Sequence, residues 1–216
     1  MQIALVGATG FVGSALLQEA LTRGHQVTAI VRDPTALPRT SDHLAVVAGD
    51  VNQPTELIRL LAGHDLVLSA YNPGWSHPDL YGAFLAGSRA IEQATAAAGV
   101  PRLLVIGGAG SLFVDGQQLV DGPHFPAEYK QGATAARDYL NELRRNTSLD
   151  WTFFSPAIEM HPGIITGRTG HYRLGGEQPV FDANGRSVLS VQDLAVAVLD
   201  EVAQARFSRQ RFTAAY

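Results

Sequence analysis

The stretch Gly7-Ala8-Thr9-Gly10-Phe11-Val12-Gly13 follows a short apolar run, Gln2–Val6, and precedes a segment with apolar residues at helical spacing. Glycines in the pattern Gly-x-x-Gly-x-x-Gly at such a strand-to-helix junction predict a phosphate-binding turn. Gly7 allows a tight exit from the strand, Gly10 lets the backbone approach a pyrophosphate, and Gly13 lets the helix pack closely on the strand. The free amides and the dipole at the start of the helix would then face the phosphates. We therefore predict that this stretch binds a dinucleotide.

Strands and helices alternate along the chain after this turn. The first expected strand is 2–6, the next are 26–31, 44–48, 65–69, 102–106 and 150–154, and the expected helices between them are 11–23, 54–61, 80–98 and 133–145. A segment rich in proline and glycine then leads to a last helix, 191–204, and an extended piece around 211–213. This alternation is typical of the α/β class with a doubly wound parallel sheet, the Rossmann fold that binds NAD(P).

The length of 216 residues suits one well-filled domain and is too short for two. We divide residues 1–216 into a core sheet, 1–154, and a loop-rich segment, 155–216, that is too small to fold independently. Ligands of open α/β sheets bind at the carboxyl edge of the strands. We therefore expect 155–216 to lie over that edge, on the side of the acceptor.

Composition excludes several classes of partner and site. The formal charge of −4, without a basic cluster, argues against nucleic acid. No apolar run approaches the roughly 20 residues of a membrane helix, so we expect no membrane partner. The chain has no cysteine, and none of its seven histidines stands at a metal-ligand spacing, so we expect no metal. Without the basic region of a signal peptide, we expect a cytoplasmic protein, and its state as monomer or homodimer stays open.

The end of the second expected strand carries Arg32 and Asp33. In this place an acidic residue accepts a hydrogen bond from the ribose 2′-hydroxyl of NAD, whereas an arginine accommodates the 2′-phosphate of NADP. Arg32 therefore favours NADP(H) as the cofactor. The adjacent carboxylate of Asp33 could reach the ribose after a small shift and keeps NAD(H) possible.

Three further strand ends meet at the same edge. Asp50 follows the third strand, where its carboxylate suits either the adenine amino group or a turn. Ser69–Tyr71 ends the fourth strand beside the expected ribose, and Gly107–Leu112 follows the fifth strand, near the expected nicotinamide. The glycines of 107–110 also suit an ordinary loop. The predicted cofactor contacts are Gly7, Thr9, Gly10, Phe11, Val12, Gly13, Arg32, Asp50, Val51, Ser69, Ala70, Tyr71, Gly107, Gly108 and Pro156.

More specific motifs occur later in the chain, at Ile106–Leu112, Trp151–Pro156, Gly167–Gly170, Ser187–Asp193 and Arg211–Thr213. With these motifs and the first glycine turn, nearly the whole chain resembles the atypical short-chain dehydrogenase/reductases. Within them it is similar to the bacterial NADH-flavin reductase family, whose members are like biliverdin/flavin reductase B. The resemblance implies an NAD(P)H-binding fold and a reductase activity.

One feature of the larger group is missing. Short-chain dehydrogenases that act on alcohols use a Tyr-x-x-x-Lys pair, in which the tyrosine donates a proton and the lysine lowers its pKa. Here Tyr129 is followed directly by Lys130, the chain's only lysine, and Ala133 stands four residues on. No other tyrosine has a lysine at this spacing, which disfavours a sugar-nucleotide epimerase or dehydratase. Flavin reduction needs no such pair, because the hydride passes to the flavin N5 and water can supply the proton.

The resemblance places Ser111 at the acceptor and nicotinamide site, although a serine here could equally cap the turn after the fifth strand. Tyr129, with Phe113 and Phe125, could form the apolar wall of that site. Two function classes stay open. We favour an NAD(P)H-dependent reductase of a flavin, quinone or similar flat conjugated small molecule. The alternative is a non-catalytic NAD(P)-sensing regulatory protein, as in the NmrA-like sensors, which also lack the pair.

Overall fold

The computed structural model describes residues 1–216 and contains an eight-stranded sheet in the order β3-β2-β1-β4-β5-β8-β10-β9. The strands are β1 (Gln2–Val6), β2 (Gln26–Val31), β3 (Leu44–Ala48), β4 (Leu66–Ser69), β5 (Arg102–Ile106), β8 (Asp150–Ser155), β9 (Arg173–Gly175) and β10 (Gln210–Ala215). All neighbours are parallel except β9 and β10. The predicted doubly wound Rossmann sheet is confirmed.

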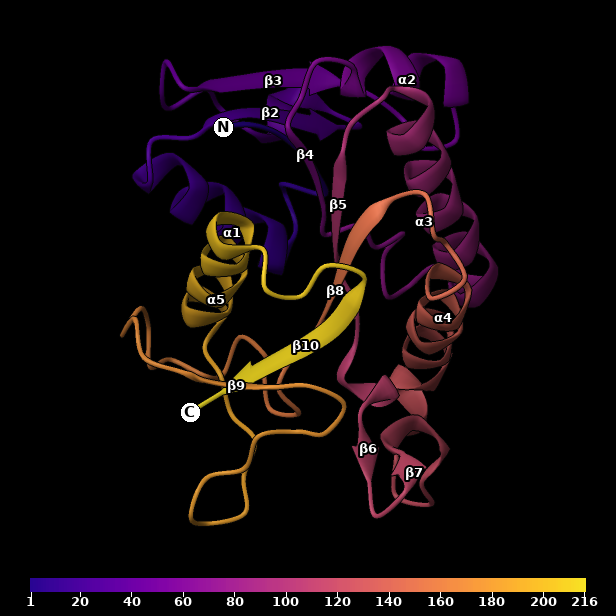
Figure 1. The fold of residues 1–216 in the computed structure, drawn as a ribbon, viewed down its shortest axis with the longest axis vertical. Helices are drawn as coiled ribbons and strands as arrows, with labels where there is room; N and C mark the ends of the chain where they lie inside the picture. Colours follow the sequence, from indigo (N-terminus) through magenta and orange to yellow (C-terminus); the bar gives the residue numbers. More distant parts are fainter.

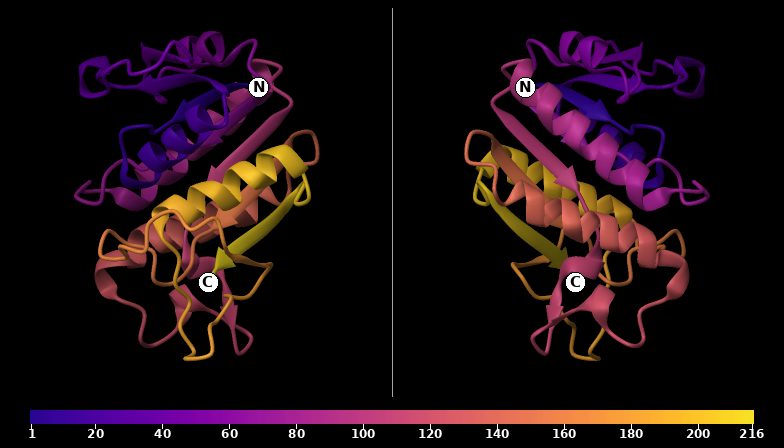
Figure 2. Two further views of the ribbon diagram at one scale, coloured as in Figure 1. Left: turned by 90° about the vertical axis from the view of Figure 1, so that its left-hand side faces the viewer. Right: turned by 90° about the vertical axis from the view of Figure 1, so that its right-hand side faces the viewer.

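Five helices cover the two faces of the sheet. They are α1 (Phe11–Thr22), α2 (Pro54–Leu61), α3 (Leu80–Ala97), α4 (Ala127–Leu143) and α5 (Val191–Gln204). Figure 1 shows α1 and α5 on one face and α3 and α4 on the other, and the two views of Figure 2 face these layers in turn. Each layer encloses its own apolar core, the first around α1 and α5, the second around α2, α3 and α4. None of these helices is long and apolar enough to cross a membrane.

Short elements complete the chain at the carboxyl edge. Single 3-10 turns are η1 (Pro34–Ala36), η2 (Ala109–Ser111) and η3 (Leu119–Asp121), and β6 (Phe113–Val114) pairs with β7 (Gln117–Gln118) in a small hairpin. The hairpin and the long segment between β8 and α5 lie at the lower end of Figure 1. After β1 the chain turns onto the face of α1, and after β4 onto the face of α3. This reversal leaves a crevice between the carboxyl ends of β1 and β4, where such sheets bind dinucleotides.

Helix α4 begins six residues earlier than the predicted 133 and ends at Leu143 instead of 145. The predicted start was wrong because the polar stretch before Ala133, with Gly132 in it, does not have the apolar periodicity of a helix. In the structure Pro126 is the N-cap residue, and Glu128 lies in the first turn, where the helix dipole favours an acid. The other predicted helices agree with the structure to within one residue.

The segment 155–216 is more than a cover over the sheet edge. Its helix α5 packs on α1, and its last strand, β10, lies inside the sheet between β8 and β9. A division at residue 154 therefore separates α5 from α1 and β10 from β8. The sequence prediction also missed β9, since three residues between glycines give no strand pattern.

Buried carboxylates anchor the segment that precedes α5. Asp193 in the first turn of α5 accepts hydrogen bonds from the amides of Thr169 and Gly170, at 2.9 and 2.7 Å. Glu19 on α1, which is 5% exposed, accepts from Arg168 Nε at 2.8 Å and from Arg23 Nε at 2.8 Å. The hydrogen bond from Arg168 lowers the pKa of Glu19, burial opposes it, and Arg23 adds to the lowering. The motif at 167–170 thus fixes this segment against two helices.

Candidate cofactor site and its acceptor side

The glycine turn has two positions fixed by packing and one that is not. Gly7 has a φ of +85°, and an added Cβ would lie 2.5 Å from the carbonyl oxygen of Ala70. A Cβ on Gly13 would lie 2.0 Å from the carbonyl oxygen of Gly7. A Cβ on Gly10 would meet no protein atom closer than 3.4 Å, and Gly10 itself is exposed. Packing within the protein does not require a glycine at position 10, and its role in letting a pyrophosphate approach stays a prediction.

The start of α1 presents free backbone donors. Gly10 is the N-cap residue, no side chain caps the helix, and its first turn contains no acidic residue. No backbone carbonyl accepts from the amides of Phe11, Val12 or Gly13. Three N–H groups and the positive end of the helix dipole therefore point out of the helix, an arrangement that binds phosphate groups. The residues present fit a pyrophosphate.

Arg32 and Asp33 differ in how their side chains are used. Arg32 is exposed at the end of β2, and no hydrogen bond or ion pair to its guanidinium is present. Asp33 caps η1, and its Oδ1 accepts from the amide of Thr35 at 2.9 Å and from its hydroxyl at 2.7 Å. The hydrogen bonds from the Thr35 hydroxyl and amide lower the pKa of Asp33. The carboxylate of Asp33 thus binds the nearby Thr35, whereas the guanidinium of Arg32 is free.

Other predicted contacts lie at the same edge with their side chains largely engaged. Asp50 Oδ1 accepts hydrogen bonds from the amide and the side chain of Asn52, both at 2.9 Å, so its carboxylate forms the turn that is the alternative to an adenine contact. Tyr71 donates its hydroxyl to the carbonyl of Ala83 at 3.2 Å, and its ring fills the space left by Gly87 on α3. Thr9 is exposed, Ala70 is half-buried, and Val51, Ser69 and Pro156 are buried.

The glycines after β5 serve packing as well. A Cβ on Gly107 would lie 1.9 Å from Cζ of Phe153, so this glycine lets β8 pack beside it. A Cβ on Gly110 would lie 2.9 Å from Cβ of Ala133, which brings α4 against η2. Gly108 has more room, with Ala136 Cβ at 3.6 Å. The loop interpretation therefore accounts for Gly107 and Gly110 without a ligand, and their role in cofactor binding stays a prediction.

Ser111 lies inside the protein, with 0% exposure. Its Oγ is 3.2 Å from the carbonyl of Gly108, 3.2 Å from Oγ of Ser155 and 3.1 Å from Nη1 of Arg211. Because a guanidinium only donates, the Ser111 oxygen accepts from Arg211, and its own proton is directed to Gly108 or Ser155. Ser111 thus follows β5, as predicted. Its hydroxyl, however, forms its hydrogen bonds with groups inside the protein.

Arg211 is the residue that sequence reasoning missed here. Its side chain is 0% exposed and forms an ion pair with Glu177, which also binds Arg144 through bonds of 2.7 and 2.8 Å. Burial works to raise the pKa of Glu177, but hydrogen bonds from Arg211 and Arg144 outweigh it and lower the pKa. Burial also lowers the pKa of Arg211, whose Nε has no partner. A charged residue in a strand that is otherwise mostly apolar, β10 (Gln210–Ala215), was the signal available in the sequence.

Tyr129 is exposed in the first turns of α4, and Lys130 points elsewhere. Consecutive helical residues project about 100° apart. Lys130 lines a hollow of about 290 Å³ together with Asp79 and Tyr81, at the start of α3. Of the two phenylalanines predicted for the acceptor wall, Phe125 comes within 3.5 Å of the Cβ position of Gly110, and Phe113 lies in β6. The chain's only lysine therefore does not assist Tyr129.

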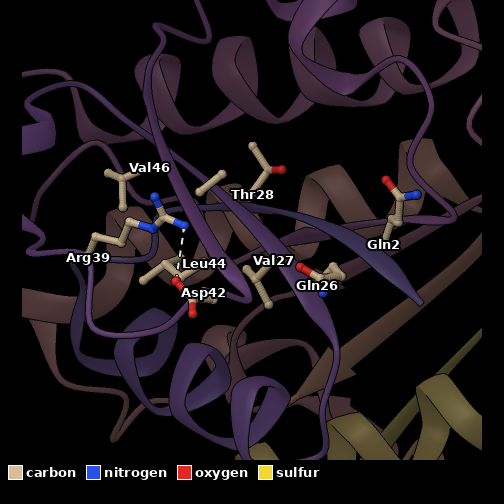
Figure 3. A pocket seen from close by; sticks show the side chains of 9 residues that line it. Gln2, Gln26, Val27, Thr28, Arg39, Asp42, Leu44 and Val46 are labelled. Carbon is tan, nitrogen blue, oxygen red and sulfur yellow. Dashed lines mark ion pairs between the residues drawn. The ribbon is translucent and has the colours of Figure 1, made fainter.

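A larger hollow, about 560 Å³, lies at the other end of the sheet. It is lined by the first residues of three strands, Gln2, Gln26 and Leu44, and by the exposed ion pair of Arg39 with Asp42 at 3.5 Å (Figure 3). An exposed ion pair of this kind contributes little to stability. This hollow is at the amino edge, away from the glycine turn, and has no link to the predicted site.

Comparison with known proteins gives a consistent result. A family model described as NAD(P)H-binding matches residues 7–203. A relative from Bacillus subtilis (strain 168) is named "Uncharacterized protein YwnB". The two sequences are 37% identical, and the match covers 99% of this chain and 97% of the length of the relative.

Three solved structures cover all of this chain. A "putative exported protein" from Burkholderia pseudomallei is 42% identical with a TM-score of 0.88, over 100% of its own length. A "putative epimerase" from Bacteroides thetaiotaomicron is 41% identical with a TM-score of 0.91, over 96% of its length. A "putative NADH-flavin reductase" from Streptococcus pneumoniae TIGR4 is 34% identical with a TM-score of 0.87, over 99% of its length. Together with the glycine turn and the free amides of α1, these matches show that the chain belongs to the NAD(P)H-binding family.

Proposed function

We propose that this protein is an NAD(P)H-dependent reductase that passes a hydride to a flavin, a quinone or a similar flat conjugated acceptor. The observation that carries the proposal is the surface of α4 around Tyr129. Ala133 stands where the proton-transfer lysine of a dehydrogenase would stand, and it packs against Gly110. Lys130 lies on another face of the helix. Chemistry on an alcohol or sugar lacks its acid–base pair here, whereas reduction of a flavin or quinone needs none.

The residues of the chain supply binding and orientation. A bound reduced nicotinamide supplies the hydride, and the accompanying proton comes from water. The amides of Phe11, Val12 and Gly13 hold the pyrophosphate, and Gly10 lets it approach. The strand ends after β4 and β5 set the path along which the cofactor extends. The protein therefore orients the cofactor and the acceptor and excludes side reactions, and the reaction requires no side chain as an acid.

We further propose that NADP(H) is preferred to NAD(H). The support is the contrast between Arg32, whose guanidinium is free, and Asp33, whose carboxylate is committed to Thr35. A free guanidinium at this strand end suits a 2′-phosphate, and a committed carboxylate is not available to a ribose hydroxyl.

Two of the similar structures bear on the acceptor. The Streptococcus pneumoniae protein, whose name says NADH-flavin reductase, is 34% identical to this chain and agrees with the proposal. The Bacteroides thetaiotaomicron protein is named as an epimerase, an activity for which this chain lacks the tyrosine–lysine pair. We propose the cytoplasm as the compartment, with which the lack of cysteine is compatible, whereas the similar Burkholderia pseudomallei protein is named as exported.

The test is a turnover assay with the purified protein. NADPH or NADH is mixed with FMN, riboflavin, menadione or ubiquinone-1, and the absorbance of the reduced nicotinamide is followed. We expect a decrease that depends on both the enzyme and at least one acceptor, faster with NADPH than with NADH. Flat traces with every acceptor, alongside saturable binding of NADPH, would reject the reductase.

The second candidate is a protein that senses the cofactor without catalysis. It is favoured by the burial of Ser111, whose hydroxyl is held by three interior partners and is not presented to an acceptor. A sensor of this kind would bind NADPH and NADP⁺ with similar affinity and would turn over no acceptor. Calorimetric titration with both forms of the cofactor, run beside the turnover assay, separates the two functions.

A further inference from the structure

Two large aromatic side chains are exposed side by side at the start of α4. Trp75, in the loop between β4 and α3, is 61% exposed, and Tyr129 on α4 is 49% exposed. Their rings meet edge to face, with centroids 5.6 Å apart and planes at 81°. An indole left in water forgoes the free energy that burial of its apolar surface would provide. Most exposed aromatics of this chain are isolated, so this pair calls for an explanation.

The indole is held in place although it is exposed. Gly132 has no side chain, and a Cβ there would lie 3.0 Å from Cζ3 of Trp75, so one edge of the indole rests directly on α4. The loop around it forms two hydrogen bonds, from the amide of Gly74 to Oδ1 of Asn72 at 2.8 Å and from the amide of His77 to the carbonyl of Gly74 at 3.0 Å. A fixed aromatic surface of this kind binds a flat ring without a large loss of side-chain entropy.

Contacts along the chain connect this pair to the predicted cofactor site. The loop of Trp75 starts at Ala70, whose carbonyl oxygen lies against Gly7 of the glycine turn. Tyr129 lies one turn before Ala133 on the same face of α4, and Ala133 packs on Gly110 after β5. A dinucleotide held at the start of α1 extends its nicotinamide half across the carboxyl ends of β4 and β5. On this path of the cofactor, Trp75 and Tyr129 would lie beside an acceptor that receives a hydride from the nicotinamide.

We propose that Trp75, braced by Gly132 and Tyr129, is the surface on which the acceptor ring stacks, and that it determines the preference for electron-poor conjugated rings. This rests on the proposed function. An oxidised isoalloxazine or a quinone is flat and electron-poor, and it stacks favourably on the electron-rich face of an indole. An aliphatic ketone or a sugar gains nothing from such a surface. Trp75 selects the substrate and takes no part in proton transfer.

The test uses riboflavin, whose own fluorescence is quenched by contact with an indole, in the presence of NADP⁺ so that no reduction occurs. We expect saturable quenching by the wild-type protein, about tenfold weaker binding by Trp75→Ala, and near wild-type binding by Trp75→Phe, which keeps an aromatic face. Affinity for NADP⁺ should be the same in all three proteins, which controls for damage to the cofactor site. The other tryptophan, Trp151, is 2% exposed and cannot reach the ligand.

Turnover separates this proposal from the function on which it rests. With menadione or riboflavin as acceptor, Trp75→Ala should raise KM about tenfold and leave kcat within about twofold of wild type. Unchanged KM and unchanged riboflavin binding in Trp75→Ala would overturn the stacking surface and leave the reductase intact. Binding that depends on Trp75 without any turnover would support the surface and overturn the reductase. If the wild-type protein neither bound nor reduced any of the acceptors, both would be wrong.

Discussion

Arg32 and Asp33 are adjacent residues of opposite charge, and only the arginine is free to bind a ligand. We expect Arg32→Ala to weaken NADPH binding about ten- to a hundredfold, because one charge-assisted contact to the 2′-phosphate is lost. NADH has no such phosphate and should bind almost as before. Titration of both cofactors against both proteins measures this difference, and an equal loss for NADPH and NADH would show that Arg32 does not touch the phosphate.

Gly10 and Gly13 offer a second comparison between single residues. Gly13→Ala would force a Cβ to within 2.0 Å of a carbonyl oxygen, so we expect a loss of about 1–3 kcal/mol in the free energy of unfolding. At Gly10 the backbone is extended, with φ −78°, and an added Cβ would meet no protein atom closer than 3.4 Å, so Gly10→Ala should change the stability by less than about 1 kcal/mol. Its affinity for NADPH should nevertheless fall at least about tenfold, since the methyl group would occupy the approach of the pyrophosphate.

Urea unfolding and cofactor titration of the two variants check this prediction. Retention of full NADPH affinity by a stable Gly10→Ala protein would contradict the phosphate site. Loss of stability by that variant would instead mean that packing, and not a ligand, requires the glycine.

At the scale of the site, the sequence predicted the backbone features and not the side-chain networks. A turn of three glycines between a strand and a helix has few structural solutions, so Gly7 and Gly13 could be interpreted in advance. The burial of Ser111 depends on Arg211, which lies 100 residues away in the chain. Only the packing of β8 against β10 brings them together, and no local pattern contains that information.

Secondary-structure elements were predictable where one periodicity dominates. Helix α2 was predicted at its observed bounds, because Pro54 at its first position and its strong apolar face give clear signals. Helix α4 was predicted six residues short, because its first turns carry exposed polar residues and interact with the loop of Trp75. Tertiary contacts, and not local propensity, stabilise that start.

The contact between α1 and the loop of Arg168 gives a pH-dependent prediction. The pKa of Glu19 is lowered in the folded protein, so its carboxylate stabilises the fold above the ordinary pKa of 4.5 and this contribution is lost as the pH falls below it. Glu19→Gln should therefore have a lower Tm than wild type near pH 7, and the difference should shrink at about pH 3.5. Circular dichroism at both pH values measures it.

The matched control is Glu128→Gln, at an exposed position on α4 that forms no ion pair. Glu128 interacts only with the dipole of α4, so at pH 7 the Tm of this variant should fall by much less than that of Glu19→Gln. A constant difference between Glu19→Gln and wild type would mean that the carboxylate contributes through packing and not through its charge.

The whole molecule is one doubly wound sheet, and a ligand at its switch point stabilises every element that meets there. A ligand that binds only the folded state at 100 times its Kd adds about 2.7 kcal/mol. For a chain of this size this corresponds to an increase in Tm of about 5–10 °C. We expect NADPH to produce such a shift, and nicotinamide mononucleotide, which has no pyrophosphate, to produce much less. Equal shifts with both ligands, or a full NADPH shift in Gly10→Ala, would place the nucleotide elsewhere.

The position of β10 between β8 and β9 has a consequence for how the chain folds during synthesis. The ribosome synthesises β8 well before residues 210–215. Until β10 is made, one edge of β8 has no partner strand, and β9 has no partner strand at either edge. Trp151, Phe153 and Phe154 make β8 strongly apolar, and an open apolar edge readily pairs with other chains. A nascent chain stopped before β10 is therefore prone to aggregate, and the last strand closes the sheet and protects it in a single step.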